Sequence, residues 1–150
     1  MSGSITFFVP GIAQPQGSKR LLHAPNRDEP VMVDDARQAR PWRQAIRSVL
    51  FDMPERPDLQ FGEVVVQLVF RFPRPKSHFG EGKNAGAIKD SKIVAPFITA
   101  PDLDKLCRAV GDALTDLIYK DDSQVSELRA HKRYCALGED PGMEATVWWA

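Results

Sequence analysis

An apolar stripe that runs through residues 103–118 constrains the fold of this 150-residue chain more than any other feature. Its members recur at intervals of three and four residues, which is the spacing of one helical face. They are Leu103, Leu106, Cys107, Val110, Ala113, Leu114, Leu117 and Ile118. The pattern predicts an amphipathic helix over residues 103–118 that packs on a core through one side.

Alternating apolar residues predict the strands that such a helix would cover. Over residues 62–72, every second side chain points to one face, and the valines between them indicate that the other face is partly covered. Similar alternation predicts strands at residues 4–9, 124–134 and 143–149. A second amphipathic helix is expected at residues 40–51, with Pro41 in its first turn. Residues 14–30 are polar and rich in turn formers, so we expect a loop or ribbon there.

These elements predict an α+β fold in which a small mixed β-sheet packs with two main helices. A single domain over residues 1–150 is long enough for a hydrophobic core without disulfides. Cys107 and Cys135 have no CxxC spacing and are expected to be reduced thiols. The chain shows no apolar run near the roughly 20 residues that cross a bilayer, and no secretory signal. We therefore expect a cytoplasmic protein with no membrane partner.

The largest irregular segment covers residues 73–100 and is rich in lysine and arginine. Loops of this length in a small domain are usually functional or disordered, so we expect a flexible basic loop. Such a loop suits a phosphate backbone, and a poorly ordered insertion is the plainer alternative. The formal net charge of zero argues weakly against a nucleic-acid partner, but binding depends on local clusters of charge.

Aspartates gather at both ends of the predicted helix. Asp102 and Asp104 stand where a loop enters it, and Asp121 and Asp122 precede the next strand. If residues 101–104 are extended, Asp102 and Asp104 share a side. Capping can explain Asp104 at the helix start and Asp121 at the strand start, because carboxylates accept backbone hydrogen bonds there. It leaves Asp102 and Asp122 unexplained.

A chain that folds back after the helix can bring Asp122 towards Asp102 and Asp104, although the sequence does not fix that approach. Three converging carboxylates would repel one another without a cation. Oxygen ligands of this kind suit Mg²⁺, and Mn²⁺ is possible. A calcium EF-hand is excluded, because Leu106 and Cys107 stand where that loop needs an acid or amide and a glycine.

The stretch PDLDKLCRAVGDALTDLIYKDDSQV strongly resembles the signature of the RusA family of Holliday junction resolvases. That signature runs as Asp-x-Asp-Asn/Lys-Leu, a basic residue, Asp-Ala-Leu and Asp-Asp-x-Gln-Val. FRFPRPKSH and RAHKRY resemble the same family, especially its phage and prophage members. The resemblance implies a homodimeric endonuclease that needs Mg²⁺ or Mn²⁺ and nicks two strands symmetrically at a four-way junction. It implies that Asp102, Asp104 and Asp122 bind the metal.

The resemblance also assigns a catalytic position to Arg108, where the family usually has lysine. Arginine keeps the positive charge but cannot give up a proton, so only a role in clamping phosphate or stabilising the transition state survives. Lys105 stands where many relatives have asparagine and is expected to add positive charge. Asp112 lies one turn beyond Arg108 and is expected to be its ion-pair partner.

Further basic residues are candidates for contacts with the DNA backbone. They are Lys76, Lys105, Arg129, His131 and Arg133, together with the rest of the 74–92 loop and the helix face of Arg40, Arg43 and Arg47. A solvated surface is the alternative for the helix face and for the strand residues. Trp148 and Trp149 are expected to lie in the core or in a dimer contact.

Three other interpretations stay open. The chain could be a nuclease for flaps, forks or other branched DNA with the same active site. It could be a junction-binding protein with impaired catalysis, which the arginine at position 108 favours slightly and the intact aspartates oppose. It could also be a domain whose acids only cap a helix, but that explains neither the joint spacing nor the basic loop.

Overall fold

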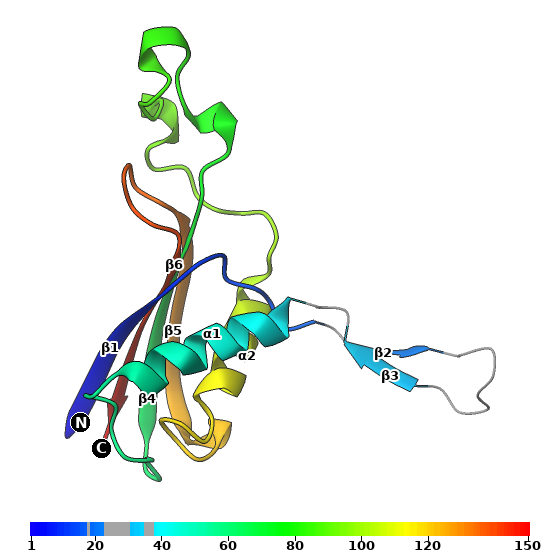
Figure 1. Cartoon of the computed structure of the whole chain (residues 1–150), viewed down its shortest axis with the longest axis vertical. Helices are drawn as coiled ribbons and strands as arrows, with labels where there is room; N and C mark the ends of the chain where they lie inside the picture. Colours follow the sequence, from blue (N-terminus) through cyan, green and yellow to red (C-terminus); the bar gives the residue numbers. More distant parts are fainter. Residues whose placement is uncertain (18, 23–30, 35–37) are drawn as a thin grey trace.

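The computed structural model of the chain describes residues 1–17, 19–22, 31–34 and 38–150. Its main sheet has four strands in the order β1-β6-β4-β5. They are β1 (Gly3–Pro10), β4 (Val64–Phe72), β5 (Val125–Tyr134) and β6 (Gly142–Trp149). β6 pairs antiparallel with β1 and β4, whereas β5 pairs parallel with β4. The sheet is therefore mixed, and the predicted α+β class is confirmed (Figure 1).

Two helices cover one face of this sheet. α1 (Ala39–Asp52) contacts β1 and α2, and α2 (Leu103–Leu114) contacts β5. Figure 1 shows both helices in front of the strands. The alternation predicted for β4 is confirmed, because its inward side chains are at most 5% exposed: Val64, Val66, Leu68, Phe70 and Phe72. Burying these side chains away from water is the main force that holds the helices on the sheet.

The boundaries of α2 differ from the predicted ones. The helix ends at Leu114, where Thr115 turns to an extended conformation and Asp116 has a φ of 67°. Leu117 and Ile118 are nevertheless buried, so the apolar stripe continues after the helix has stopped. At the other end Asp102 holds the N-cap position, and its side chain makes no capping hydrogen bond. The expectation that Asp104 caps the helix is wrong, because Asp104 already lies in the first turn.

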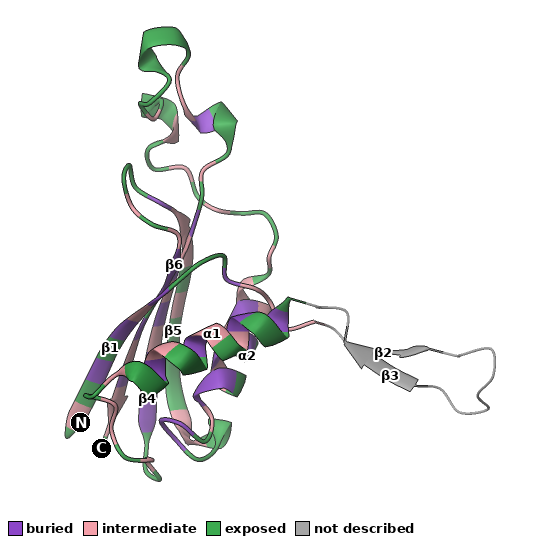
Figure 2. Ribbon diagram, in the orientation of Figure 1, coloured by how far each residue is buried: buried purple, intermediate pink, exposed green. Residues whose placement is uncertain are grey.

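The segment 73–100 extends beyond the end of the sheet and contains three short 3-10 helices (Figure 1). They are η1 (Lys76–His78), η2 (Gly82–Asn84) and η3 (Asp90–Lys92). Arg74 holds its base, since the guanidinium donates to the carbonyl oxygens of Cys135 at 2.8 Å, Lys92 at 2.6 Å and Ile93 at 3.0 Å. Figure 2 shows that most of the segment is exposed. The flexibility expected of it stays a prediction.

Two short strands, β2 (Lys19–Leu22) and β3 (Val31–Asp34), pair antiparallel as a second sheet. They agree with a ribbon near residues 14–30, of which 18 and 23–30 lie outside the described residues. In the part of the chain that the structure describes, both cysteines are free, and no helix is long and apolar enough to cross a membrane.

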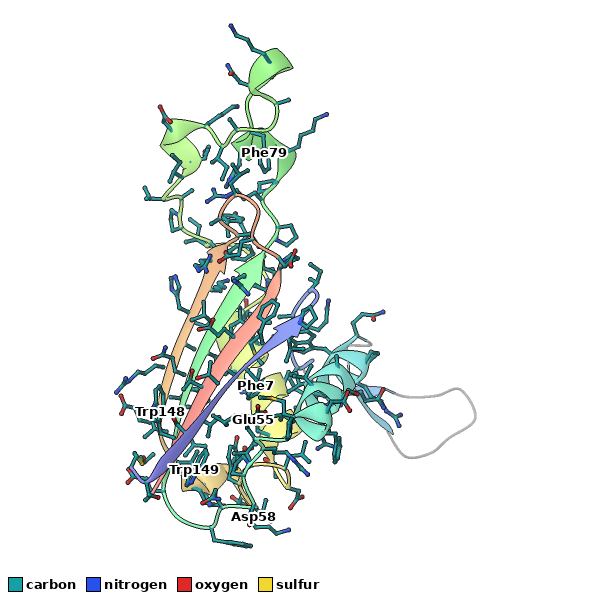
Figure 3. The ribbon with its side chains drawn as sticks, turned by 60° about the vertical axis from the view of Figure 1, so that its left-hand side comes forward. Phe7, Glu55, Asp58, Phe79, Trp148 and Trp149 are labelled. Carbon is teal, nitrogen blue, oxygen red and sulfur yellow. The ribbon has the colours of Figure 1, made fainter. Side chains whose placement is uncertain are left out.

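The two tryptophans near the C-terminus lie at one end of β6 (Figure 3). Their side chains point to opposite faces, as successive residues of a strand do. Trp149 packs against the core, and a Cβ atom on Gly3 would come within 2.5 Å of its ring. The core role predicted for Trp149 is confirmed. Trp148 is half-buried on the other face.

Candidate active site

A groove of about 760 Å³ lies between α2 and the strands β4 and β5, and we call it the α2 groove. Asp104, Arg108, Gly111 and Asp122 form its polar side. The remaining lining residues are mostly apolar: Val66, Leu68, Leu103, Cys107, Val110, Leu114, Tyr119, Val125, Leu128 and Ala130. Three of the four predicted catalytic residues thus share one groove.

Asp102 and Asp104 lie on either side of the start of α2. Both side chains are exposed, and the positive end of the helix dipole favours negative charge at this place. Lys105 Nζ lies 3.7 Å from Asp102 Oδ2, so this lysine pairs with a predicted metal ligand across one helical turn. Its predicted contact with DNA stays a prediction.

Asp122 approaches α2 from the far end of the turn that follows the helix. Its Oδ1 lies 3.0 Å from the Thr115 hydroxyl and 3.2 Å from the Tyr119 hydroxyl. Burial and the charge of Asp122 raise the pKa of Tyr119, so that hydroxyl keeps its proton and donates to the carboxylate. These two hydroxyls orient Asp122, and neither was identified from the sequence.

The neighbouring Asp121 has a structural role. Its carboxylate accepts a hydrogen bond from the Ser123 backbone at 2.8 Å, and the Gln124 side chain accepts one from the Asp121 backbone. Together they form a capping box on η4 (Asp122–Gln124). The capping role predicted for Asp121 is confirmed, and the choice of Asp122 as the metal ligand stays a prediction.

Because Gly111 has no side chain, the Asp122 carboxylate can lie close beside the helix. A Cβ atom at this position would lie 3.3 Å from Asp122 Oδ1, which is closer than ordinary contact. Gly111 is also two helical turns beyond Asp104, roughly 10 Å along the axis. Asp122 therefore lies beside the C-terminal part of α2, and Asp102 and Asp104 lie at its start.

The separation along α2 bears on the predicted metal site. Among the residues that the structure describes, no three histidine, cysteine, aspartate or glutamate side chains gather closely enough to hold one ion. Asp104 and Asp122 line the same groove, whereas Asp102 does not. Their carboxylate oxygens are the donors that Mg²⁺ prefers. The chemistry of these residues fits a hard divalent ion, and the assignment of Asp102, Asp104 and Asp122 as its ligands stays a prediction.

Arg108 lies one turn beyond Asp104, and its exposed side chain lines the α2 groove. The expected ion pair with Asp112 is wrong, because no N–O distance between these two described side chains is within 4 Å. The guanidinium is therefore not neutralised by Asp112. Its positive charge stays available on the polar side of the groove.

Two of the predicted DNA-binding arginines have carboxylate partners within the protein. Arg129 Nε lies 2.7 Å from Glu127, and Arg133 binds both oxygens of Glu139 at 2.6 and 3.0 Å. Arg71 adds a contact with Glu139 at 2.9 Å, and these hydrogen bonds lower the pKa of Glu139 to about 2. Lys76 and His131 are exposed. DNA contacts by Lys76, Arg129, His131 and Arg133 stay predictions.

Part of the basic face of α1 has a structural role. Arg47 donates to the carbonyl oxygens of Ala113 at 3.2 Å and Asp112 at 3.1 Å, which caps the end of α2. Arg43 donates to the side chain of Gln16 at 2.5 Å. These two residues connect elements of the fold, and Arg40 is exposed.

Lys132 supports the site and was also missed from the sequence. Its ammonium donates to the carbonyl oxygens of Thr99 at 2.6 Å and Pro101 at 2.8 Å, directly before Asp102. One signal was present: Lys132 falls on the same strand face as Leu128 and Ala130, where a lysine needs a partner.

Comparisons with known proteins cover nearly the whole chain. The family described as "Endodeoxyribonuclease RusA" matches residues 10–147. A relative from Bacillus subtilis (strain 168), named "Uncharacterized protein YqaN", is 31% identical over 144 residues, which cover 95% of this chain and 94% of the relative. The match includes the aspartates at both ends of α2 and the whole of the α2 groove. The chain belongs to the RusA endodeoxyribonuclease family.

Proposed function

We propose that the chain is a metal-dependent endodeoxyribonuclease that resolves four-way DNA junctions by paired symmetric nicks, in recombination and repair. Membership of the RusA family supports cutting within DNA. The observation that carries the proposal is that Asp104, Arg108 and Asp122 line one groove. Hydrolysis of a phosphodiester needs acids that bind a metal ion and a cation that stabilises the transition state. Asp104 and Asp122 would be the acids, and Arg108, which Asp112 does not neutralise, would be the cation.

In this proposal Asp102, Asp104 and Asp122 hold Mg²⁺ or Mn²⁺. A bound ion of this kind stabilises charge on a phosphate oxygen and lowers the pKa of an attacking water. Tyr119 and Thr115 hold the Asp122 carboxylate in place through its Oδ1. Arg108 places positive charge where negative charge grows in the transition state, and it carries no proton that could be transferred.

A homodimer forms part of the proposal. A four-way junction has approximate two-fold symmetry, so a two-fold dimer presents two equivalent sites to two equivalent strands. Sedimentation of the purified chain alone and with a junction would test this. A species of one chain per junction under conditions that allow cutting would contradict it.

The decisive experiment is cleavage of an end-labelled four-way junction beside linear duplex, flap and fork of the same arm sequence. Each substrate is incubated with Mg²⁺, Mn²⁺ or EDTA. We expect paired nicks at symmetric positions of the junction, dependent on metal. Equal cutting of all branched substrates would indicate a general branched-DNA nuclease. Tight junction binding without cutting in either metal would favour a junction-binding protein with impaired catalysis, for which Arg108 is the specific reason.

A further inference from the structure

A second groove, of about 570 Å³, lies beside the candidate site, between residues 93–97 and the end of β5. We call it the β5 groove. It is lined by Arg74, Ile93, Val94, Ala95, Pro96, Phe97, Leu103, His131, Lys132, Arg133, Tyr134 and Ala136. Its volume is in the range of pockets that hold small ligands, about 300–1,000 Å³.

The lining of the β5 groove carries uncompensated positive charge. It includes no aspartate or glutamate, in contrast to the α2 groove. Arg74 and Lys132 satisfy their donors mainly with backbone carbonyls, which carry no net charge. Arg133 is the exception, because Glu139 pairs with it. An anionic ligand would therefore find two cations that no carboxylate of the described residues neutralises.

One wall of the β5 groove is aromatic. The rings of Phe97 and Tyr134 lie 4.7 Å apart, and Phe72 supports Phe97 from behind with a stacked contact at 4.8 Å. Both lining rings are half-buried, with Lys132 Nζ 5.0 Å from the centre of the Phe97 ring and the Arg74 guanidinium 5.7 Å from that of Tyr134. Val94 forms an exposed rim with 88% of its surface accessible. Aromatic walls beside cations are the surroundings in which unpaired nucleobases stack on proteins.

The β5 groove adjoins the candidate active site. Leu103 lines both grooves, and it stands between Asp102 and Asp104 at the start of α2. A DNA strand whose phosphate lies at these aspartates would thus run next to the β5 groove. A macromolecular partner that is anionic and carries planar bases fits this lining better than a second copy of the chain.

We propose that the β5 groove binds the nucleotide next to the phosphate that is cut, with its base unstacked from the duplex and placed against the accessible parts of Phe97 and Tyr134. This inference rests on the proposed function, because it places the cut phosphate at Asp102 and Asp104. The nucleotide's own phosphate faces the side of Lys132. Such a subsite positions one strand of branched DNA, where bases near the branch point unstack at low cost.

The test uses two variants of the groove and one matched control in the full-length chain. Phe97→Leu keeps an apolar side chain but removes the aromatic face, and Val94→Ser changes only the exposed rim. Phe61→Leu removes an exposed phenylalanine that lines neither groove. Binding of a single-stranded tetranucleotide is followed by amide chemical shifts, and junction cleavage is measured separately.

We expect the tetranucleotide to shift resonances of residues 93–97 and 131–134 in the wild type. We expect Phe97→Leu to weaken this binding about tenfold, which is typical of losing one base–aromatic stack, and Val94→Ser to weaken it less. Phe61→Leu should bind like the wild type. If the junction is cut but Phe97→Leu binds and cuts like the wild type, the inference fails and the proposed function stands.

If the tetranucleotide binds as expected but no junction is cut, the proposed nuclease function fails and the nucleotide site stands. Sedimentation tests the alternative occupant of the β5 groove, which is a second copy of the chain. If Phe97→Leu or Val94→Ser turns a dimer into a monomer and leaves nucleotide binding unchanged, the β5 groove is a contact between two copies, which overturns the inference.

Discussion

Lys132 Nζ lies 2.8 Å from the carbonyl oxygen of Pro101, so strand β5 holds the chain directly before the first candidate aspartate. The same ammonium binds the carbonyl of Thr99 and lies 5.0 Å from the centre of the Phe97 ring. One lysine therefore links the start of α2 to the sheet.

Replacing Lys132 by methionine should misplace Asp102 and Asp104. We expect kcat for junction cleavage to fall about tenfold to hundredfold, since a shift of ~1 Å at a catalytic group costs that much, with a smaller change in KM. Lys132→Arg should recover part of kcat because it keeps the donors. Lys83→Met removes an exposed lysine of the outer segment and is the charge control. Equal kcat in Lys132→Met and Lys83→Met would remove Lys132 as a positioning residue.

Asp122→Asn should abolish cleavage and leave junction binding nearly intact. The substitution keeps the shape of the side chain and removes the charge that a metal ion needs. We expect a loss of at least about hundredfold in a metal-dependent cleavage assay. Asp116→Asn is the matched control, because Asp116 is exposed near the same helix end and asparagine tolerates its φ of 67°. Normal cutting by Asp122→Asn would exclude this residue from the site.

Arg108→Ala should slow cleavage more than it weakens binding. Removing a charge aimed at the transition state costs about hundredfold in kcat at comparable sites. Arg108→Lys, which restores the residue usual in the family, tests whether a removable proton adds anything. If Arg108→Lys changes the pH dependence of kcat, proton transfer is possible at this position. An unchanged rate in Arg108→Ala would show that the side chain has no part in catalysis.

Gly111→Ala should separate stability from activity. Alanine in a helix interior is more favourable than glycine by about 0.5–1 kcal/mol, so the melting temperature should not fall. The new Cβ would lie 3.3 Å from Asp122 Oδ1 and push the carboxylate away, so cleavage should decrease severalfold. Gly62→Ala is the control, since a Cβ there meets nothing within 4 Å. Full activity in Gly111→Ala would mean that the position of Asp122 is not critical.

Glu139→Gln should reduce stability at neutral pH and have no effect in strong acid. The pKa of Glu139 is lowered from 4.5 to about 2, so its contribution is present above pH 4.5 and is lost as the pH falls towards 2. We expect a loss of about 1–2 kcal/mol at pH 7 in urea unfolding, after allowance for partial exposure. The difference should become small near pH 2 and vanish below it. Glu127→Gln alters an exposed ion pair and should lower the free energy of unfolding by less. Equal losses in the two variants would contradict the stabilising role of Glu139.

The sequence predicted the arrangement of the core well, because burial imposes a period that can be read directly. The inward face of β4 and the position of α1 follow from the spacing of apolar residues alone. The end of α2 could not be read in this way. Leu117 and Ile118 are buried for the same reason as Leu114, so hydrophobicity does not mark where the helix stops.

The site was predictable in its residue types and less so in its contacts. Asp104, Arg108 and Asp122 were identified from spacing and family resemblance, and they share a groove. Their supports were not identified, because the hydroxyls of Thr115 and Tyr119 become partners of Asp122 only when the turn after α2 folds back. Arg133 was predicted to contact DNA because its strand shows only a basic side chain at that position. Its partner Glu139 lies in the connection after β5, and the spacing of residues within the strand does not reveal this ion pair.

The parallel pairing of β4 with β5 also determines when the nuclease site can exist. Val64 pairs with Val125, and every candidate catalytic residue lies in the long connection between them. Contacts between distant parts of a chain form slowly, because the intervening loop must first be closed. During synthesis, the site can assemble only after β5 has left the ribosome and docked beside β4. A nascent or truncated chain that lacks this strand therefore lacks one wall of the α2 groove, which Val125, Leu128 and Ala130 of β5 form.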